Sequence, residues 1–227
     1  MSTLWTFGDS FTKQHNQEYI DWKGFEIKQW PELLGEILNY EVKNFGRGGS
    51  SNYQIFDDFI EQINNIQKND IVIIGWGLVG KFRYVHNNEF KDIHPNDYNN
   101  YNYGDPNTFN HIALNREDPT WFNEVYRWEK LIEAFCDSKN IKVFFWSSED
   151  NQLIYGLSQE LKNKRTYICN DSETNLITYM VNNHGAKTIN KETKGLIGDH
   201  HLSERGHLTM ANVIYDCVRN SLVFNSL

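Results

Sequence analysis

The chain has few cysteines and no excess of basic charge. Its three cysteines, Cys136, Cys169 and Cys217, are scattered and show no CxxC spacing, which favours free thiols over a disulfide framework. The net charge is −8, and no cluster of Lys and Arg interrupts the acidic balance. Because phosphate binding needs a basic face, we expect no nucleic-acid partner.

Long apolar runs are also missing. No stretch reaches the ~18 apolar residues that a membrane-spanning helix needs, and residues 1–11 lack the features of a secretory signal. We therefore expect a cytoplasmic protein with no membrane partner. The length of 227 residues and the hydrophobic content of 39% fit one domain with a substantial core. We predict a single domain over residues 1–227.

Short apolar runs alternate with segments of helical periodicity. Residues 13–28 show no clear period and are predicted as a loop or a short helix. The alternation predicts an α/β fold with a parallel sheet, whose sites lie at the carboxyl ends of the strands. We expect strands at 4–7, 42–45, 71–74 and 141–146, and helices at 29–40, from Ser50 or Ser51 to Ile63, at 121–139 and at 203–222.

One long segment does not follow this alternation. Residues 82–120 are rich in Asn, Tyr, His and Asp and have no sustained period. An irregular insertion of this length is either functional or an excursion without a role. We predict an irregular insertion, and its tyrosines could form a flap that stacks on sugar rings or could make protein contacts.

Two motifs near the ends of the chain carry the candidate chemistry. Gly8-Asp9-Ser10 ends the first apolar run, where a serine hydroxyl stands clear of the sheet edge and a following helix would direct N–H groups at it. Asp199 and His201 lie two residues apart, just before the last predicted helix. Acyl transfer needs a nucleophile, a base, and a group that orients the base. We assign these roles to Ser10, His201 and Asp199 respectively.

Other interpretations of these residues remain open. Ser10 could be an ordinary turn serine, Asp199 or Ser203 could cap the last helix, and His200 could replace His201. Asp199, His200, His201 and His207 are close enough in sequence to consider a metal site, although the partner ligands expected after other strands are missing. Neither GxSxG nor a phosphate-binding glycine motif occurs.

Three blocks together resemble the SGNH (GDSL-type) esterase family, in the family's order and over almost the whole chain. They are Phe7 to Phe11, Asn44 to Asn52 and Asp199 to His207. The resemblance implies a flavodoxin-like three-layer α/β/α sandwich and hydrolysis of O-acyl esters without a cofactor or a metal. It also implies oxyanion donors from the Ser10 backbone, the Gly49 backbone and an asparagine side chain.

The asparagine is where the chain departs from the family. The family's third block reads Gly-x-Asn-Asp after the third strand, whereas Gly75-Trp76-Gly77 is followed by leucine here. Loss of one oxyanion donor typically lowers turnover by ~10²–10³. We consider the Asn52 side chain or the Gly77 N–H as replacements, and Trp76 as a wall of the site.

These observations predict a serine esterase that hydrolyses O-acyl esters, in particular acetyl esters, on a small molecule or a carbohydrate. The polar and aromatic insertion favours carbohydrate over long-chain lipid, because a lipase needs a broad apolar rim. Acyl transfer to a sugar is a related possibility. The alternative is a catalytically weak glycan-binding or structural module that keeps the fold.

Overall fold

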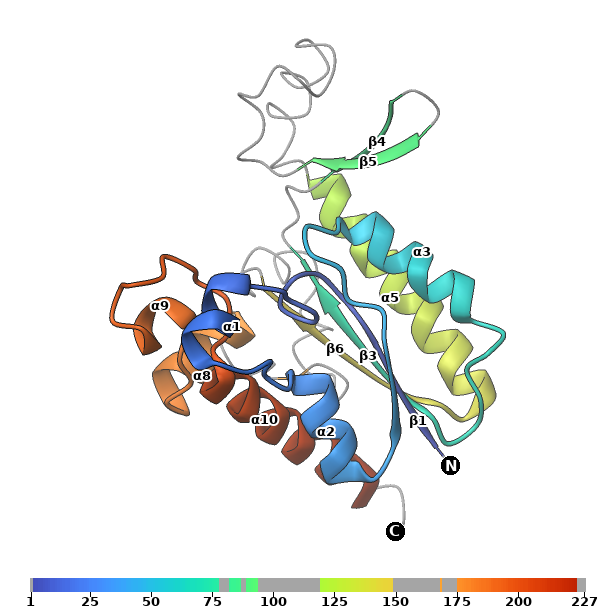
Figure 1. The fold of residues 1–227 in the computed structure, drawn as a ribbon. Helices are drawn as coiled ribbons and strands as arrows, with labels where there is room; N and C mark the ends of the chain where they lie inside the picture. The colour runs from blue at the N-terminus through green and yellow to red at the C-terminus, as the bar shows by residue number, and fades with distance from the viewer. Residues whose placement is uncertain are drawn as a thin grey trace.

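The computed structural model describes residues 2–77, 82–86, 89–93, 119–148, 168 and 175–223. A four-stranded parallel sheet lies at its centre, with the strands in the order β2-β1-β3-β6 (Figure 1). This order, with the first strand between the second and third, is the flavodoxin-like arrangement. The expected fold class is therefore confirmed. The strands are β1 (Thr3–Phe7), β2 (Glu41–Asn44), β3 (Ile71–Trp76) and β6 (Lys142–Ser147).

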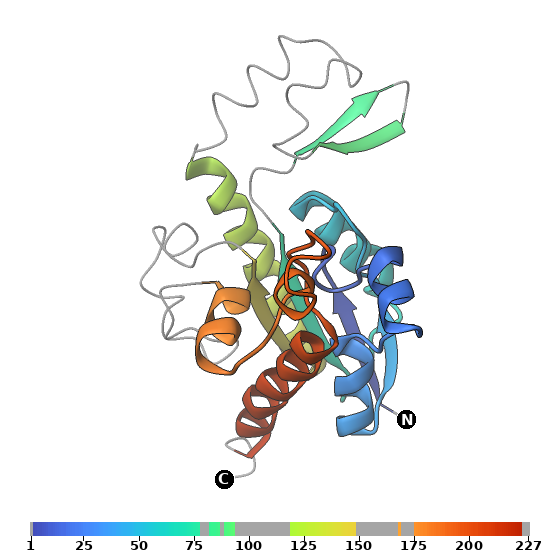
Figure 2. The same cartoon turned by 60° about the vertical axis from the view of Figure 1, so that its left-hand side comes forward.

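Helices cover both faces of this sheet. Figures 1 and 2 show α2, α8 and α10 on one face and α3 and α5 on the other. The result is the three-layer sandwich that the sequence predicted. The described helices are α1 (Gln17–Lys23), α2 (Trp30–Leu38), α3 (Asn52–Gln62), α5 (Pro119–Lys139), α8 (Leu176–Asn183), α9 (Ile189–Glu192) and α10 (Glu204–Val223).

Side chains along the central strands alternate between the two faces of the sheet, and this divides the core in two. Leu4, Ile71 and Ile73 pack against the helices of one layer, while Trp5 and Val72 pack against those of the other. All residues of β1 and β3 are buried, as expected for parallel strands covered on both faces. The carboxyl ends of these buried strands form the fixed edge from which the site is built.

The segment predicted to be irregular contains regular structure at its start. Residues Phe82–His86 (β4) and Glu89–Ile93 (β5) form an antiparallel hairpin in which Phe82 pairs with Ile93. The prediction was wrong there, because backbone pairing between two strands does not require a regular alternation of apolar residues. Residues 94–118, including most of the expected flap, lie outside the described residues.

Two further helices add to those that were predicted. The short helices α8 and α9 were not predicted. Helix α1 lies within residues 13–28, which were predicted as a loop or a short helix. In α10, Leu208 is half-exposed, whereas His207 and Met210 are fully buried. Within the described part of the chain, no helix combines the length and apolarity needed to cross a membrane.

Candidate active site

Ser10 lies in a tight turn at the end of β1. The Asp9 carbonyl accepts hydrogen bonds from the N–H groups of Thr12 (2.9 Å) and Lys13 (3.1 Å), and the buried Asp9 carboxylate accepts one from Phe11 N–H (3.0 Å). Gly8 is required at this point, because a Cβ there would lie 2.0 Å from the Thr12 hydroxyl. The turn therefore holds the Ser10 side chain at the sheet edge.

The helix expected directly after Ser10 is not formed. The bonds to the Asp9 carbonyl make a single turn, and α1 begins only at Gln17. Any oxyanion donor on this segment must therefore come from the turn itself. Among the described residues, the Ser10 N–H has no hydrogen-bond acceptor and remains available for that purpose.

The loop between α9 and α10 carries the other two predicted residues. Its backbone is fixed at both: Asn190 N–H donates to the Asp199 carbonyl (2.8 Å), and Ile189 N–H donates to the His201 carbonyl (2.9 Å). The Ser203 hydroxyl oxygen accepts a bond from Gly206 N–H (3.3 Å), so Ser203 rather than Asp199 caps the last helix. Asp199 is thus free of the capping role that the sequence left open.

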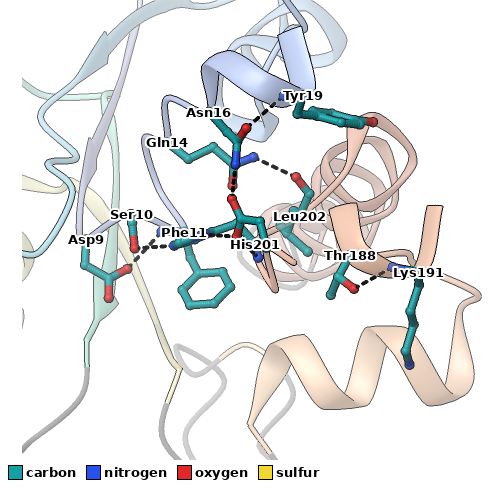
Figure 3. A network of polar contacts seen from close by, with 11 residues as sticks. Asp9, Ser10, Phe11, Gln14, Asn16, Tyr19, Thr188, Lys191, His201 and Leu202 are labelled. Carbon is teal, nitrogen blue, oxygen red and sulfur yellow. Dashed lines mark hydrogen bonds and ion pairs between the residues drawn. The ribbon is translucent and has the colours of Figure 1, made fainter. Parts of the chain in front are cut away.

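Ser10, His201 and Asp199 form one hydrogen-bonded chain. His201 Nε2 lies 2.7 Å from Ser10 Oγ (Figure 3), and His201 Nδ1 lies 2.6 Å from Asp199 Oδ1. The same carboxylate oxygen accepts the His201 backbone N–H at 2.8 Å. An imidazole with Nδ1–H directed at the carboxylate presents Nε2 as the acceptor for the serine hydroxyl. His200, the alternative base, is exposed and takes no part in this chain.

The carboxylate of Asp199 is stabilised in its ionised form. Partial burial acts to raise the pKa of Asp199, but the bond from His201 N–H, the adjacent imidazole and the Asn16 amide outweigh it. The pKa of Asp199 therefore lies below its ordinary value. A carboxylate that stays ionised can stabilise the positive charge that forms on His201 during proton transfer.

Two side chains that the sequence analysis did not select join the Ser10 segment to the His201 loop. Gln14 Nε2 donates to the Leu202 carbonyl at 2.7 Å (Figure 3), and Asn16 Nδ2 donates to Asp199 Oδ2. These contacts span 188 and 183 positions. The only local signal was the N-cap position of Asn16, which predicts a helix start and says nothing of Asp199.

A glycine turn after β2 lies beside Ser10. Arg47 N–H donates to the Gly8 carbonyl (3.0 Å), and the Arg47 guanidinium pairs with the buried Asp58 of α3 at 2.8 Å. Gly49 has φ +81°, a conformation that side chains other than glycine rarely adopt. Among the residues described, the Gly49 N–H has no acceptor. Gly49 and Ser10 both line the same cavity.

The two candidates for the missing donor are bonded to each other. Asn52 Oδ1 accepts the Gly77 N–H at 2.8 Å, and Asn52 Nδ2 donates to the Gly77 carbonyl at 3.3 Å. In this arrangement the amide closes the end of β3, and the Gly77 N–H and one of the two Asn52 Nδ2 hydrogens are engaged. Trp76 is 1% exposed and donates to Glu129 at 2.8 Å, so it belongs to the core and not to the wall of the site.

The cavity at the triad is large, and polar, charged and glycine residues outnumber apolar ones in its lining. It has a volume of about 1370 Å³, and Phe11 and Ile177 are the only large apolar side chains among its described lining residues. Lys13, Glu26 and Arg47 contribute charge of both signs. The described residues contain no group of three or more side chains suited to hold a metal ion.

His207 has a structural role. It is fully buried, and its Nδ1 accepts the Trp30 N–H at 3.3 Å. Burial lowers the pKa of His207 to about 3, and the nearby His201 lowers it as well. His207 is therefore neutral at physiological pH and fixes the start of α10 against α2.

Comparisons with known proteins gave matches among solved structures alone. No family model and no curated protein matches the chain. A lipolytic protein of the G-D-S-L family from Veillonella parvula is 15% identical over 95% of this chain and 97% of that chain, with a TM-score of 0.44. A Bacillus subtilis protein is 16% identical over 97% of this chain and 56% of that chain (TM-score 0.49). A third structure, described as a possible lipase from Chitinophaga pinensis, is 13% identical over 97% and 98% (TM-score 0.35).

Proposed function

We propose that the chain is a serine esterase that hydrolyses O-acyl esters, in particular acetyl esters on carbohydrate, through a covalent acyl-enzyme. The observation that carries the proposal is the hydrogen-bonded chain from Ser10 through His201 to Asp199. The link from Ser10 to His201 measures 2.7 Å and spans 191 positions, and the link from His201 to Asp199 measures 2.6 Å within one loop. A serine bonded to a histidine that is bonded to an aspartate provides the nucleophile, the base and the orienting group that acyl transfer needs.

In the first half of the reaction, Ser10 Oγ attacks the carbonyl carbon of the ester. His201 Nε2 accepts the hydroxyl proton as the C–O bond forms, and Asp199 stabilises the resulting imidazolium. The Ser10 and Gly49 N–H groups are the proposed donors to the oxyanion. His201 then gives its proton to the departing alkoxide, and the alcohol leaves behind an acyl group on Ser10.

In the second half, water takes the place of the alcohol. His201 accepts a proton from this water, which attacks the acyl carbon. Collapse of the second tetrahedral intermediate breaks the bond to Ser10 Oγ, and His201 returns the proton to the serine. The products are a carboxylic acid and the free enzyme, and no redox step or cofactor is needed. A sugar hydroxyl in place of water would give acyl transfer by the same steps.

The character of the cavity supports a polar alcohol and a short acyl group. A volume of about 1370 Å³ exceeds what a small ester needs, and pockets for single drug-sized ligands measure about 300–1,000 Å³. The lining offers many hydrogen-bonding groups and few apolar side chains. A sugar chain presents hydroxyls along its length, whereas a long acyl chain needs a continuous apolar surface.

A second candidate function is a glycan-binding or structural module with weak catalysis. The observation in its favour is the Asn52–Gly77 pair, which engages the Gly77 N–H and one of the two hydrogens of the Asn52 amide, the groups considered as a third oxyanion donor. Under this alternative the polar cavity still binds a glycan, but Ser10 turns over slowly. The two candidates differ in whether Ser10 is activated.

The test is covalent labelling with a fluorophosphonate, read by intact-mass and peptide mass spectrometry. We expect one adduct on Ser10, and no adduct in Ser10→Ala. Ser148→Ala is the matched control, because Ser148 lines the same cavity and its hydroxyl donates to the Trp76 carbonyl (3.3 Å). That variant should label like the wild type.

A series of p-nitrophenyl esters and acetylated oligosaccharides then tests the substrate. We expect the acetyl ester to be the best of the series, with kcat/KM falling as the acyl chain lengthens. Absence of a Ser10 adduct in folded protein would reject the esterase and favour the binding module. If Ser10 is labelled but long acyl chains are preferred, the esterase proposal stands and only the proposed carbohydrate ester substrate is rejected.

A further inference from the structure

The carboxylate of Asp199 is held at both of its oxygens. Oδ1 accepts the His201 ring Nδ1–H and the His201 backbone N–H. Oδ2 accepts the side-chain amide of Asn16, from the segment that follows Ser10. The Asp199 side chain is 19% exposed, so these donors replace much of its hydration. Both carboxylate oxygens must be satisfied for the group to remain ionised and in one orientation.

The Asn16 amide is itself fixed in orientation. Its Oδ1 accepts the Tyr19 N–H at 2.8 Å, and Asn16 is thereby the N-cap of α1. Because the oxygen and the nitrogen of an amide lie on opposite branches of one planar group, an oxygen committed to the helix directs the NH₂ away from it. The NH₂ donates to Asp199 Oδ2, and Figure 3 shows Asn16 between Tyr19 and the His201 loop.

The helix that carries this cap is anchored to the elements that flank the His201 loop. Tyr19 is 1% exposed; its hydroxyl donates to Glu192 of α9 at 2.9 Å and accepts the Glu204 N–H of α10 at 3.0 Å. Lys23 pairs with the carboxylates of the same two residues, Glu192 at 3.5 Å and Glu204 at 2.5 Å. These contacts fix the start of α1 relative to the His201 loop. Asn16 is therefore held within hydrogen-bond distance of Asp199.

We propose that Asn16 is a positioning residue that acts through Asp199 on the His201 base, an inference that rests on the proposed esterase function. With Oδ2 bound to Asn16, Asp199 presents Oδ1 to the His201 Nδ1–H. This contact selects the imidazole tautomer whose Nε2 accepts the Ser10 proton. The proposed chain of contacts therefore has four members: Ser10, His201, Asp199 and Asn16.

A capping role alone requires only the oxygen of Asn16. Serine and aspartate cap helices about as well as asparagine, but neither provides an amide donor that reaches Asp199. Asn16→Ser and Asn16→Asp should therefore keep α1 and lose the bond to Asp199. Asn16→Asp also places a second carboxylate beside Asp199, and like charges at this distance oppose each other's ionisation. Asn16→Ala loses both the cap and the donor.

The experiment compares these variants in p-nitrophenyl acetate hydrolysis and in the rate of fluorophosphonate labelling of Ser10. We expect kcat of Asn16→Ser to fall by about ten- to a hundredfold, the range set by one hydrogen bond to a charged group. KM should change by less than about twofold, since Asn16 contacts no substrate in this proposal. The labelling rate should fall with kcat, and Asn16→Asp should lose at least as much.

A direct readout of Asp199 makes the test independent of turnover. The Asn16 amide is one of the groups that hold the pKa of Asp199 below its ordinary value, so its loss should raise that pKa. Carbon-13 NMR titration of the Asp199 carboxyl in wild type and in Asn16→Ser measures the change. Equal thermal stability of the two proteins would exclude a loss of fold as the cause.

Two failures are distinguishable. If wild-type Ser10 is not labelled, the esterase proposal fails, and the NMR titration alone decides whether Asn16 orients Asp199. If wild type is labelled but Asn16→Ser and Asn16→Asp keep its kcat, labelling rate and Asp199 titration, the positioning role is overturned. A loss in Asn16→Ala alone would then assign Asn16 to helix capping only.

Discussion

The two sides of the site are built in different ways. The base side, residues 10–16 and 199–203, is held by side-chain contacts between segments far apart in the chain. The oxyanion side, residues 46–52 and 75–77, offers backbone N–H groups on a glycine turn, and its one candidate amide is bonded to Gly77. In the proposed mechanism, activation of the nucleophile thus depends on several mutually supporting side chains, and stabilisation of negative charge depends on backbone conformation.

Substitutions on the two sides should therefore have different effects. Side chains on the base side each have a partner whose own geometry depends on them, so a single replacement should affect the whole chain of contacts. On the oxyanion side, only a change in the backbone path should move the proposed donors.

The largest effect is expected from Asp199→Asn, which breaks the base side at its centre. An amide at this position cannot hold His201 in the required tautomer, and in Ser-His-Asp sites the change lowers kcat by ~10⁴. Measurement of p-nitrophenyl acetate hydrolysis tests this. Asp21→Asn is the matched control, because Asp21 is exposed and its carboxylate contacts Gln17 (2.7 Å) on the surface of α1. Turnover within about tenfold of wild type would be incompatible with the assigned role of Asp199.

A smaller effect is expected from Gly49→Ala, which distorts the oxyanion side. Gly49 (φ +81°) and Gly24 (φ +79°) have nearly the same backbone conformation, and a Cβ at either position meets no atom within 4 Å. Each alanine should therefore destabilise the fold by about 1–2 kcal/mol through left-handed backbone strain. Only Gly49→Ala should also lower kcat, by at least about tenfold, because it displaces a proposed oxyanion donor.

Equal kcat in these two glycine variants, with equal loss of stability by chemical denaturation, would remove Gly49 from the oxyanion hole. The comparison is informative because the two alanines should introduce the same backbone strain, whereas only one of them lies beside Ser10. Gly24 ends α1, where its N–H donates to the Ile20 carbonyl, whereas Gly49 lines the cavity at Ser10.

The smallest effect on turnover is expected from Asn52→Ala. Asn52 is 5% exposed and satisfies both the N–H and the carbonyl of Gly77. Its removal should lower the free energy of unfolding by about 1–3 kcal/mol, because buried polar groups lose their partners. Turnover well below the melting temperature should change by less than about threefold. A loss of ~10² or more in kcat with unchanged stability would instead identify Asn52 as an oxyanion donor.

Local patterns predicted a large part of the fold. The β-branched run at Ile71 and the apolar run before Gly8 correctly indicated buried parallel strands, because burial on both faces requires continuous apolar residues. Periodicity likewise located α2, α3, α5 and α10 to within a few residues. The β4–β5 hairpin and the short helices α8 and α9 were missed, since their stability depends on pairing and packing more than on local periodicity.

For the site, the candidate residues could be identified without the structure: the Gly-Asp-Ser turn, the two-residue spacing of Asp199 and His201, and the lack of an asparagine after Gly75. Which of these residues meet depends on how the chain folds. His201 rather than His200 lies beside Ser10, and Ser203 caps the last helix. Asn52 pairs with Gly77, and Asn16 and Gln14 contact the His201 loop. The physical reason is that these contacts join segments many positions apart along the chain. Only the packing of β1, α1 and α10 brings those groups within hydrogen-bond distance, and no local pattern records it.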